Sequence, residues 1–203
     1  MPTGVAIRDV REQLFAAAER VLLRDGPSAL TSRAVTTEAG CAKGVLHRHF
    51  ADFDAFLTDL VLERVEWIGW RATELRACAG TGTVADNVTG ALTELFGSVA
   101  LEMLSLLTSR NELRARLRDA GAGRLPVLRQ GTAMITAYLE AERSLGRITA
   151  DADLRAIAPM LIGSAHLTFA GRDGAPLEES AMHTIVTTAL APVLRGEELG
   201  SRL

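Results

Sequence analysis

The chain has 203 residues, of which 48% are hydrophobic, enough to bury a sizeable core and to exclude an intrinsically disordered protein. Its formal net charge of -3 excludes a globally basic nucleic-acid binder, so any anion-binding surface has to be local. No stretch is long and apolar enough to span a membrane, and the amino terminus meets charge too early for a signal peptide. We therefore expect a cytoplasmic protein with no membrane partner.

The first part of the chain predicts one long helix followed by two short ones. Apolar residues recur at three- and four-residue steps from Ile7 to Leu23, and the pattern stops at Asp25-Gly26-Pro27. Thr31 offers a hydroxyl that can cap a second helix ending near Gly40. A third helix is expected from around Ala42 to His49-Phe50. Two short helices joined at a glycine turn thus follow a longer one.

The rest of the chain keeps the helical period. A fourth helix, which Asp52 can cap, is expected from Phe53 to about Ala77, and a fifth from Val84 to Leu106. Further helices are expected at Glu112 to Arg118, Leu125 to Leu145, Ala152 to Phe169 and Leu177 to Leu194. Pro159 is expected to kink or break the helix from Ala152 to Phe169. Because no period-two alternation competes, the fold class is all-α, with domains at 1–52 and 53–203.

The third helix has two different faces. At about 100° per residue, Leu46 and Phe50 fall on one side while Lys43 and His47 fall on another. The segment from Ala42 to His49 contains no acidic residue, and Lys43 is the only lysine in the chain. One face can pack while the other reads bases and phosphates, which is the arrangement of a helix-turn-helix.

The segment from Thr31 to Phe50, TSRAVTTEAGCAKGVLHRHF, resembles the DNA-binding signature of TetR-type transcriptional regulators. The resemblance spans roughly Ile7 to Leu57. It implies a double-stranded DNA operator as partner, and it differs from the family where His47 and His49 replace aromatic residues, most often tyrosine, and where Phe53 replaces a lysine. Carried over by position, the DNA-binding residues are Thr31, Arg33, Ala42, Lys43, Gly44, Val45, His47 and His49.

The remainder of the chain contains large, adaptable side chains of the kind that surround an apolar cavity between helices, although most are expected to be plain core. The resemblance implies a pocket for an unknown small-molecule effector, bounded by the fourth to seventh helices. The candidate ligand-binding residues are Trp67, Trp70, Phe96, Met103, Arg110, Met134, Tyr138, His166 and Phe169, with Arg110, Tyr138 and His166 as polar anchors.

The last two helices predict a homodimer. They have little room to bury both faces within one subunit, and their small and apolar residues can pack against a twofold copy. The resemblance implies the same interface. The residues concerned are Met160, Leu161, Gly163, Ser164, Ala165 and Leu167 on one helix, and Met182, Ile185, Ala189 and Val193 on the other.

These features together predict a dimeric DNA-binding regulator, a repressor that an effector releases from its operator. An all-helical enzyme is disfavoured because no acid pair or nucleophile-base set stands at helical spacing. A helical adaptor that binds only protein remains the alternative. We expect no cofactor and no metal, since His47 and His49 point in different directions on a helix. Cys41 and Cys78 are expected to be buried, inert thiols rather than a redox switch.

Overall fold

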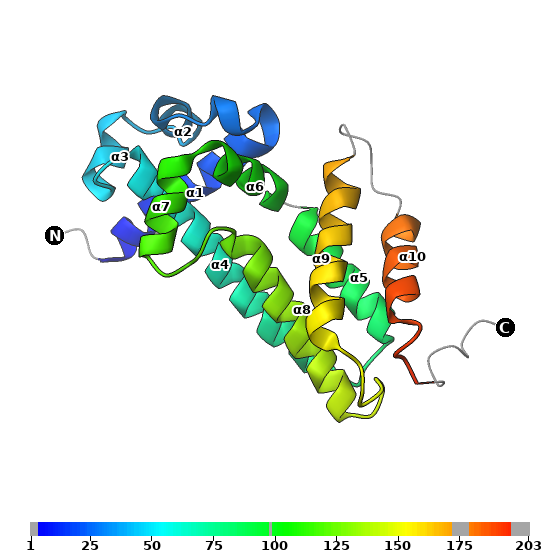
Figure 1. Cartoon of the computed structure of the whole chain (residues 1–203). Coiled ribbons are helices and arrows are strands. Elements are labelled where there is room, and N and C mark those ends of the chain that lie inside the picture. Colours follow the sequence, from blue (N-terminus) through cyan, green and yellow to red (C-terminus); the bar gives the residue numbers. More distant parts are fainter. Residues whose placement is uncertain (1–3, 98, 172–178, 196–203) are drawn as a thin grey trace. The chain divides into compact units, whose positions relative to one another are not determined.

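The computed structural model of the chain describes residues 4–97, 99–171 and 179–195 (Figure 1). These residues form two compact units. The first unit comprises Met1–Arg64 and Glu102–Pro126, and the second comprises Val65–Leu101 and Val127–Leu203. Helix α4, Phe53–Ala77, is continuous across the division at Arg64.

The first unit is built around a three-helix core at its amino-terminal end. Helix α1 packs on α2, and α3 packs on α2. The side chains of Leu14, Leu22 and Leu46 are at most 1% exposed in this core. The elements are α1 (Gly4–Asp25), the 3-10 helix η1 (Pro27–Ala29), α2 (Ser32–Glu38), α3 (Gly44–His49), the first part of α4, most of α6 (Ala100–Ser109) and α7 (Asn111–Asp119).

The second unit is a helical bundle in which α5 packs against α9 and α10, and α9 packs against α10 (Figure 1). Helix α8 approaches two of its neighbours closely at Gly131, where a Cβ atom would lie 2.7 Å from a methyl of Leu95 and 3.2 Å from one of Ile162. Glycine is therefore the residue that lets these helices meet. The bounds are α5 (Val84–Phe96), α8 (Pro126–Ser144), α9 (Leu154–Ala170) and α10 (Glu179–Leu190).

The all-α prediction is confirmed. Over the residues that the structure describes, the only extended pairing is an isolated antiparallel bridge between Ile148 and Leu194. Helix α4 has the predicted bounds, and Asp52 caps it by accepting a hydrogen bond of 2.7 Å from the Ala55 N–H. Burial of the apolar stripes at helical spacing explains why the pattern located these helices.

One predicted helix was wrong in its extent. The expected helix from Val84 to Leu106 is divided into α5 and α6, and α5 ends at Phe96. At Gly97 a Cβ atom would lie 2.5 Å from the Thr93 carbonyl oxygen, a backbone approach that only glycine tolerates. Pro159 lies inside α9, which continues through it, so of the kink or local break predicted there the break is absent and the kink stays a prediction.

The last helix ends earlier than predicted. Leu177, its expected first residue, lies outside the described residues. Helix α10 ends at Leu190, and Val193 and Leu194 instead belong to the segment that pairs with residues 147–149. Among the described helices, none alone has both the length and the apolar composition to cross a bilayer, although the broken pair α5 and α6 reaches them together.

Candidate DNA-binding surface and ligand cleft

The turn between α2 and α3 is set by one cap and one glycine. The Ala34 N–H donates to Thr31 Oγ1 at 3.1 Å, so Thr31 caps α2 as predicted. Gly40 has a φ of +66°, in the left-handed region that glycine adopts at low cost. The Cys41 N–H then donates to the Thr36 carbonyl at 3.0 Å, which closes the end of α2. These contacts fix the direction in which the chain enters α3.

Helix α3 turns its apolar face inward, as its periodicity predicted. Leu46 is fully buried and Phe50 is 5% exposed. The Phe50 ring lies 5.8 Å from the ring of Phe15 and 5.0 Å from that of Phe56, centroid to centroid. Lys43, the residue that precedes α3, makes no side-chain cap, so the helix depends on the burial of Leu46 and on this aromatic cluster to hold it in place.

The opposite face of α3 is free to meet another molecule. Ala42, Lys43, Gly44 and His47 are exposed, while Val45 and His49 are half-buried. On α2, Thr31 and Arg33 are also exposed. The structure thus brings the eight predicted DNA-binding residues together at the start of α2 and along α3. Their contact with DNA stays a prediction.

Ion pairs neutralise the one acidic residue of α2. Glu38, at the end of α2, accepts from Arg20 Nε at 2.7 Å and from Arg24 at 2.8 Å. These hydrogen bonds lower the pKa of Glu38, so it stays ionised and paired. Within the described residues, Arg33, Lys43 and Arg48 have no acidic partner. The surface around α3 is therefore locally basic in an acidic chain.

Arg110, a predicted polar anchor for a ligand, belongs to the first unit, where its side chain contacts protein groups. Its guanidinium is 3.3 Å from Asp54 and 3.4 Å from the Leu30 carbonyl, and it lies 5.6 Å above the Phe53 ring. The first turn of α4 is thus tied to the segment between α6 and α7. Phe53, which stands where the family carries a lysine, takes part in this packing.

The second unit contains a cleft of about 410 Å³ between α4 and α5, with α8 contributing one residue. This volume is typical of a small-molecule site, for which about 300–1,000 Å³ is usual. Each of these two helices turns one face toward the cleft, and the residues that line it follow one another at helical spacing. The lining residues are Trp67, Ile68, Arg71, Glu74 and Leu75 of α4, Cys78 directly after it, Asp86, Asn87, Gly90, Ala91, Glu94 and Leu95 of α5, and Met134 of α8. Cys78 is exposed and Cys41 is half-buried, so the prediction that both thiols are buried was wrong.

Only Trp67 and Met134 of the candidate ligand-binding residues line this cleft. Trp70 is 57% exposed and lies beside Arg71. The rings of Phe96, His166 and Phe169 cluster elsewhere in the second unit, with centroids 6.1 Å and 5.9 Å from that of Phe96. Met103 is fully buried within the residues of the first unit.

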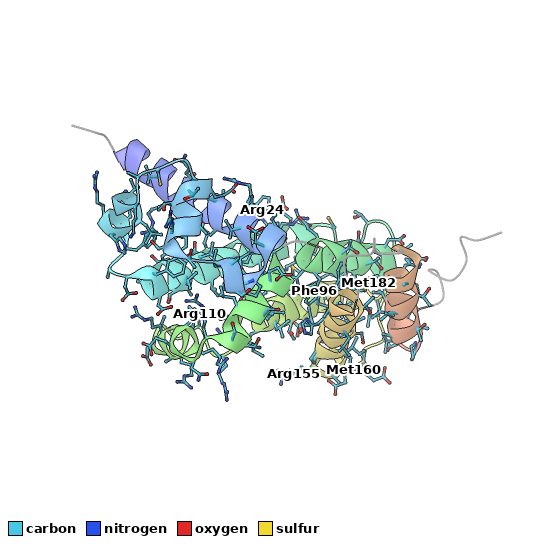
Figure 2. All side chains as sticks on the ribbon, turned by 90° about the horizontal axis from the view of Figure 1, so that it is seen from above. Arg24, Phe96, Arg110, Arg155, Met160 and Met182 are labelled. Atoms are coloured by element: carbon cyan, nitrogen blue, oxygen red, sulfur yellow. The ribbon has the colours of Figure 1, made fainter. Side chains whose placement is uncertain are left out.

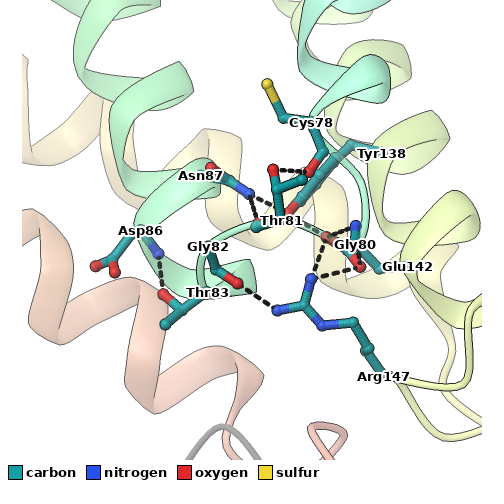
Figure 3. A network of polar contacts seen from close by, with 10 residues as sticks. All are labelled: Cys78, Gly80, Thr81, Gly82, Thr83, Asp86, Asn87, Tyr138, Glu142 and Arg147. Carbon is teal, nitrogen blue, oxygen red and sulfur yellow. Dashed lines mark hydrogen bonds and ion pairs between the residues drawn. The ribbon is translucent and has the colours of Figure 1, made fainter. Parts of the chain in front are cut away.

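Tyr138 lies behind the cleft in a buried polar network (Figure 3). Its hydroxyl donates to Glu142 Oε1 at 2.5 Å and accepts from Asn87 Nδ2 at 2.9 Å. Burial and the bond to Glu142 raise the pKa of Tyr138 above its usual range. Glu142, which is fully buried, also accepts from the Gly80 N–H at 3.2 Å and from Arg147 at 3.1 Å. Through Asn87 the cleft wall is fixed to the turn between α4 and α5.

The acidic side chains of the cleft were missed by sequence reasoning, which looked for large apolar groups. Glu74 and Glu94 resemble ordinary charges on a solvated helix face. A signal was present nonetheless, since Trp67, Arg71 and Glu74 follow at steps of four and three and so share one face of α4.

A model of the family described as "Bacterial regulatory proteins, tetR family" matches residues 14–59. Among curated proteins, none matches the chain. The solved structure of a TetR-family regulator from Agrobacterium tumefaciens is 15% identical, with a TM-score of 0.70, and the match covers 93% of this chain and 99% of that one.

Two further solved structures share the fold. A TetR regulator from Haloarcula marismortui is 16% identical, with a TM-score of 0.68 over 93% of this chain and 100% of that one. FadR from Bacillus subtilis, solved in complex with stearoyl-CoA, is 17% identical, with a TM-score of 0.66 over 89% of this chain and 97% of that one. The resemblance drawn from the sequence is therefore confirmed over residues 14–59, which match the model of the bacterial tetR family and support a DNA-binding transcriptional regulator. The chain as a whole shares the fold of these solved regulators.

Proposed function

We propose that the protein is a homodimeric repressor that leaves its operator when a small molecule occupies the cleft in the second unit. The observation that carries the DNA-binding part is the outward face of α3, which is free of acidic residues and lies over the buried Leu46 and Phe50. In this proposal residues 1–52 read DNA in the cytoplasm, and residues 53–203 bind the effector and form the dimer without catalysing a reaction.

The outer face of α9 supports the dimer. Met160 is 62% exposed and Leu167 is 73% exposed, and Gly163 between them is exposed as well. By contrast, Met182 of α10 is fully buried within the subunit (Figure 2). An apolar stripe of small and large residues left in solvent is typical of a surface that a second copy covers.

The cleft supports the effector part, because five of its thirteen lining residues belong to α4, the helix whose first turn follows α3. A ligand that fits only one arrangement of α4 and α5 shifts the population toward that arrangement. FadR, a protein of the same fold, was solved with a ligand bound. In the proposed mechanism the favoured arrangement no longer places two α3 helices in successive major grooves.

The test is a gel-shift titration of the purified protein against the DNA upstream of its own gene. Lys43→Ala with His47→Ala should weaken specific binding by at least tenfold, since a base contact is worth about 1–3 kcal/mol. If Arg33, Lys43 and Arg48 of both subunits contact phosphate, log K should fall against log salt with a slope of about -5.

Arg129→Ala is the matched control, because it removes an exposed cation from α8 and should leave binding unchanged. Full specific binding by the Lys43 and His47 double variant would refute the reading surface. No sequence-specific binding by the natural chain would instead favour a protein-binding adaptor.

A further inference from the structure

We infer that the cleft between α4 and α5 takes a small organic cation with an aromatic or apolar body. That such a ligand would regulate DNA binding rests on the proposed function. The chemical class of the ligand rests on the residues of the cleft alone. It concerns the chemical class of the ligand, which neither the fold nor the family decides.

The charges around the cleft are unequal. Three carboxylates line it, those of Glu74, Asp86 and Glu94, against the single guanidinium of Arg71. Asp86 Oδ1 lies 3.0 Å from His183 Nε2, yet the Asp86 side chain is 62% exposed. With neutral histidine the lining has an excess of negative charge, and a walled cleft concentrates the field of such groups on an entering cation.

The one cation of the lining already has its partners. Arg71 forms ion pairs with Glu74 on its own helix and with Glu94 across the cleft on α5. Its guanidinium also lies within 6.0 Å of the Trp67 ring and 5.7 Å of the Trp70 ring. An anionic ligand would have to take Arg71 from two carboxylates and leave both without a partner. A cationic ligand can instead bind Glu94 or Glu74 while Arg71 keeps the other.

The remaining walls suit an apolar body. Trp67, Ile68, Leu75, Leu95 and Met134 line the cleft, and an indole face attracts an organic cation as well as apolar carbon. Asn87 is the one uncharged polar side chain among the lining residues described. The cleft thus combines an apolar wall with carboxylates at its edge, which a lipophilic ammonium ion matches.

Gly90 offers a way to close the cleft without disturbing the fold. It lines the cleft in the middle of α5, its φ is not in the left-handed region, and a Cβ there would meet nothing within 4 Å. A leucine at this position therefore projects into open space, and leucine also has a higher helix propensity than glycine.

The experiment compares three probes that share a phenyl ring and a four-carbon chain, 4-phenylbutyltrimethylammonium, 4-phenylbutanol and 4-phenylbutyrate, by calorimetry and by tryptophan fluorescence. The chain has two tryptophans, so the fluorescence reports on Trp67 and its neighbour Trp70 directly. We expect the ammonium to bind at least tenfold more tightly than the carboxylate, with the alcohol between them.

The variants separate the cleft from other binding modes. Glu94→Gln should weaken ammonium binding at least fivefold, Gly90→Leu should abolish it, and Glu140→Gln, an exposed change on α8, should leave it unchanged. Circular dichroism confirms that each variant is folded. A carboxylate that binds as tightly as the ammonium, or ammonium binding that Gly90→Leu leaves intact, overturns the inference.

Operator binding is measured on the same samples. If none of the probes binds while the operator is bound specifically, the assignment of a cation fails and the regulator stands. If the ammonium binds with the expected selectivity while no operator is bound, the cleft chemistry holds and the proposed function fails.

Discussion

Replacing Arg147 by methionine tests the buried network behind the cleft. The Glu142 side chain is fully buried, and Arg147, whose side chain is 22% exposed, is the cation 3.1 Å from it. Arg147 also donates to the Gly82 carbonyl at 2.5 Å. Arg147→Met keeps most of the apolar stem and removes the charge, so Glu142 is left as a buried carboxylate with only Gly80 and Tyr138 as donors.

The expected cost follows from this geometry. Removing one partner of a buried ion pair costs about 3–5 kcal/mol. Because Arg147 is partly exposed and two hydrogen bonds to Glu142 remain, we expect the lower end, about 3 kcal/mol. For a chain of this size each kcal/mol lowers the melting temperature by about 2–4 °C, so a fall of about 6–12 °C is expected.

The assay is urea unfolding followed by circular dichroism, with calorimetry as a second measurement. All samples are kept at one protein concentration, because the stability of the proposed dimer would depend on that concentration. Adding Glu142→Gln to Arg147→Met should recover at least about 1 kcal/mol, since it removes the unpaired charge. Arg129→Met, an exposed change, should stay within about 0.5 kcal/mol. A cost below about 1 kcal/mol for Arg147→Met, or no recovery in the double variant, would refute the reasoning.

Two other substitutions test packing, one in each unit. Burial raises the pKa of Glu19 above its ordinary value of 4.5, so the folded state holds this proton more tightly than the unfolded state does. The natural chain should therefore lose stability relative to Glu19→Gln as pH rises from 4 to 7. A stability difference in urea titrations that does not change with pH would contradict this. Gly131→Leu should lower stability by about 1–3 kcal/mol, because its side chain would meet Leu95 and Ile162, whereas an unchanged calorimetric melting temperature would show that α8 has room to move.

The helix-turn-helix could be predicted from the sequence because its signals are local. The cap at Thr31, the glycine turn at Gly40 and the spacing of Leu46 and Phe50 each depend on neighbouring residues, and all three have the expected geometry. The resemblance to one family added the identity of the DNA-reading residues. Their roles remain to be tested by the variants above.

The ligand cleft could not be predicted in the same way, because it depends on which helices meet. Phe96 and Tyr138 have the size of cavity-lining residues, but their faces of α5 and α8 point into the core. The division of the helix at Gly97 was hidden as well, because apolar residues continue at helical spacing on both sides of it. Arg110 stood in a run of arginines, and nothing in that run indicated its pairing with Asp54.

The uncapped start of α3 affects how loss-of-function variants of this protein should be interpreted. A six-residue helix without a cap has little stability of its own and depends on the cluster of Phe15, Phe50 and Phe56 beneath it. A substitution in that cluster would silence the regulator although no altered atom reaches a nucleotide. Genetic screens for inactive alleles should therefore recover these phenylalanines alongside the residues proposed to contact bases, and a melting curve will tell the two groups apart.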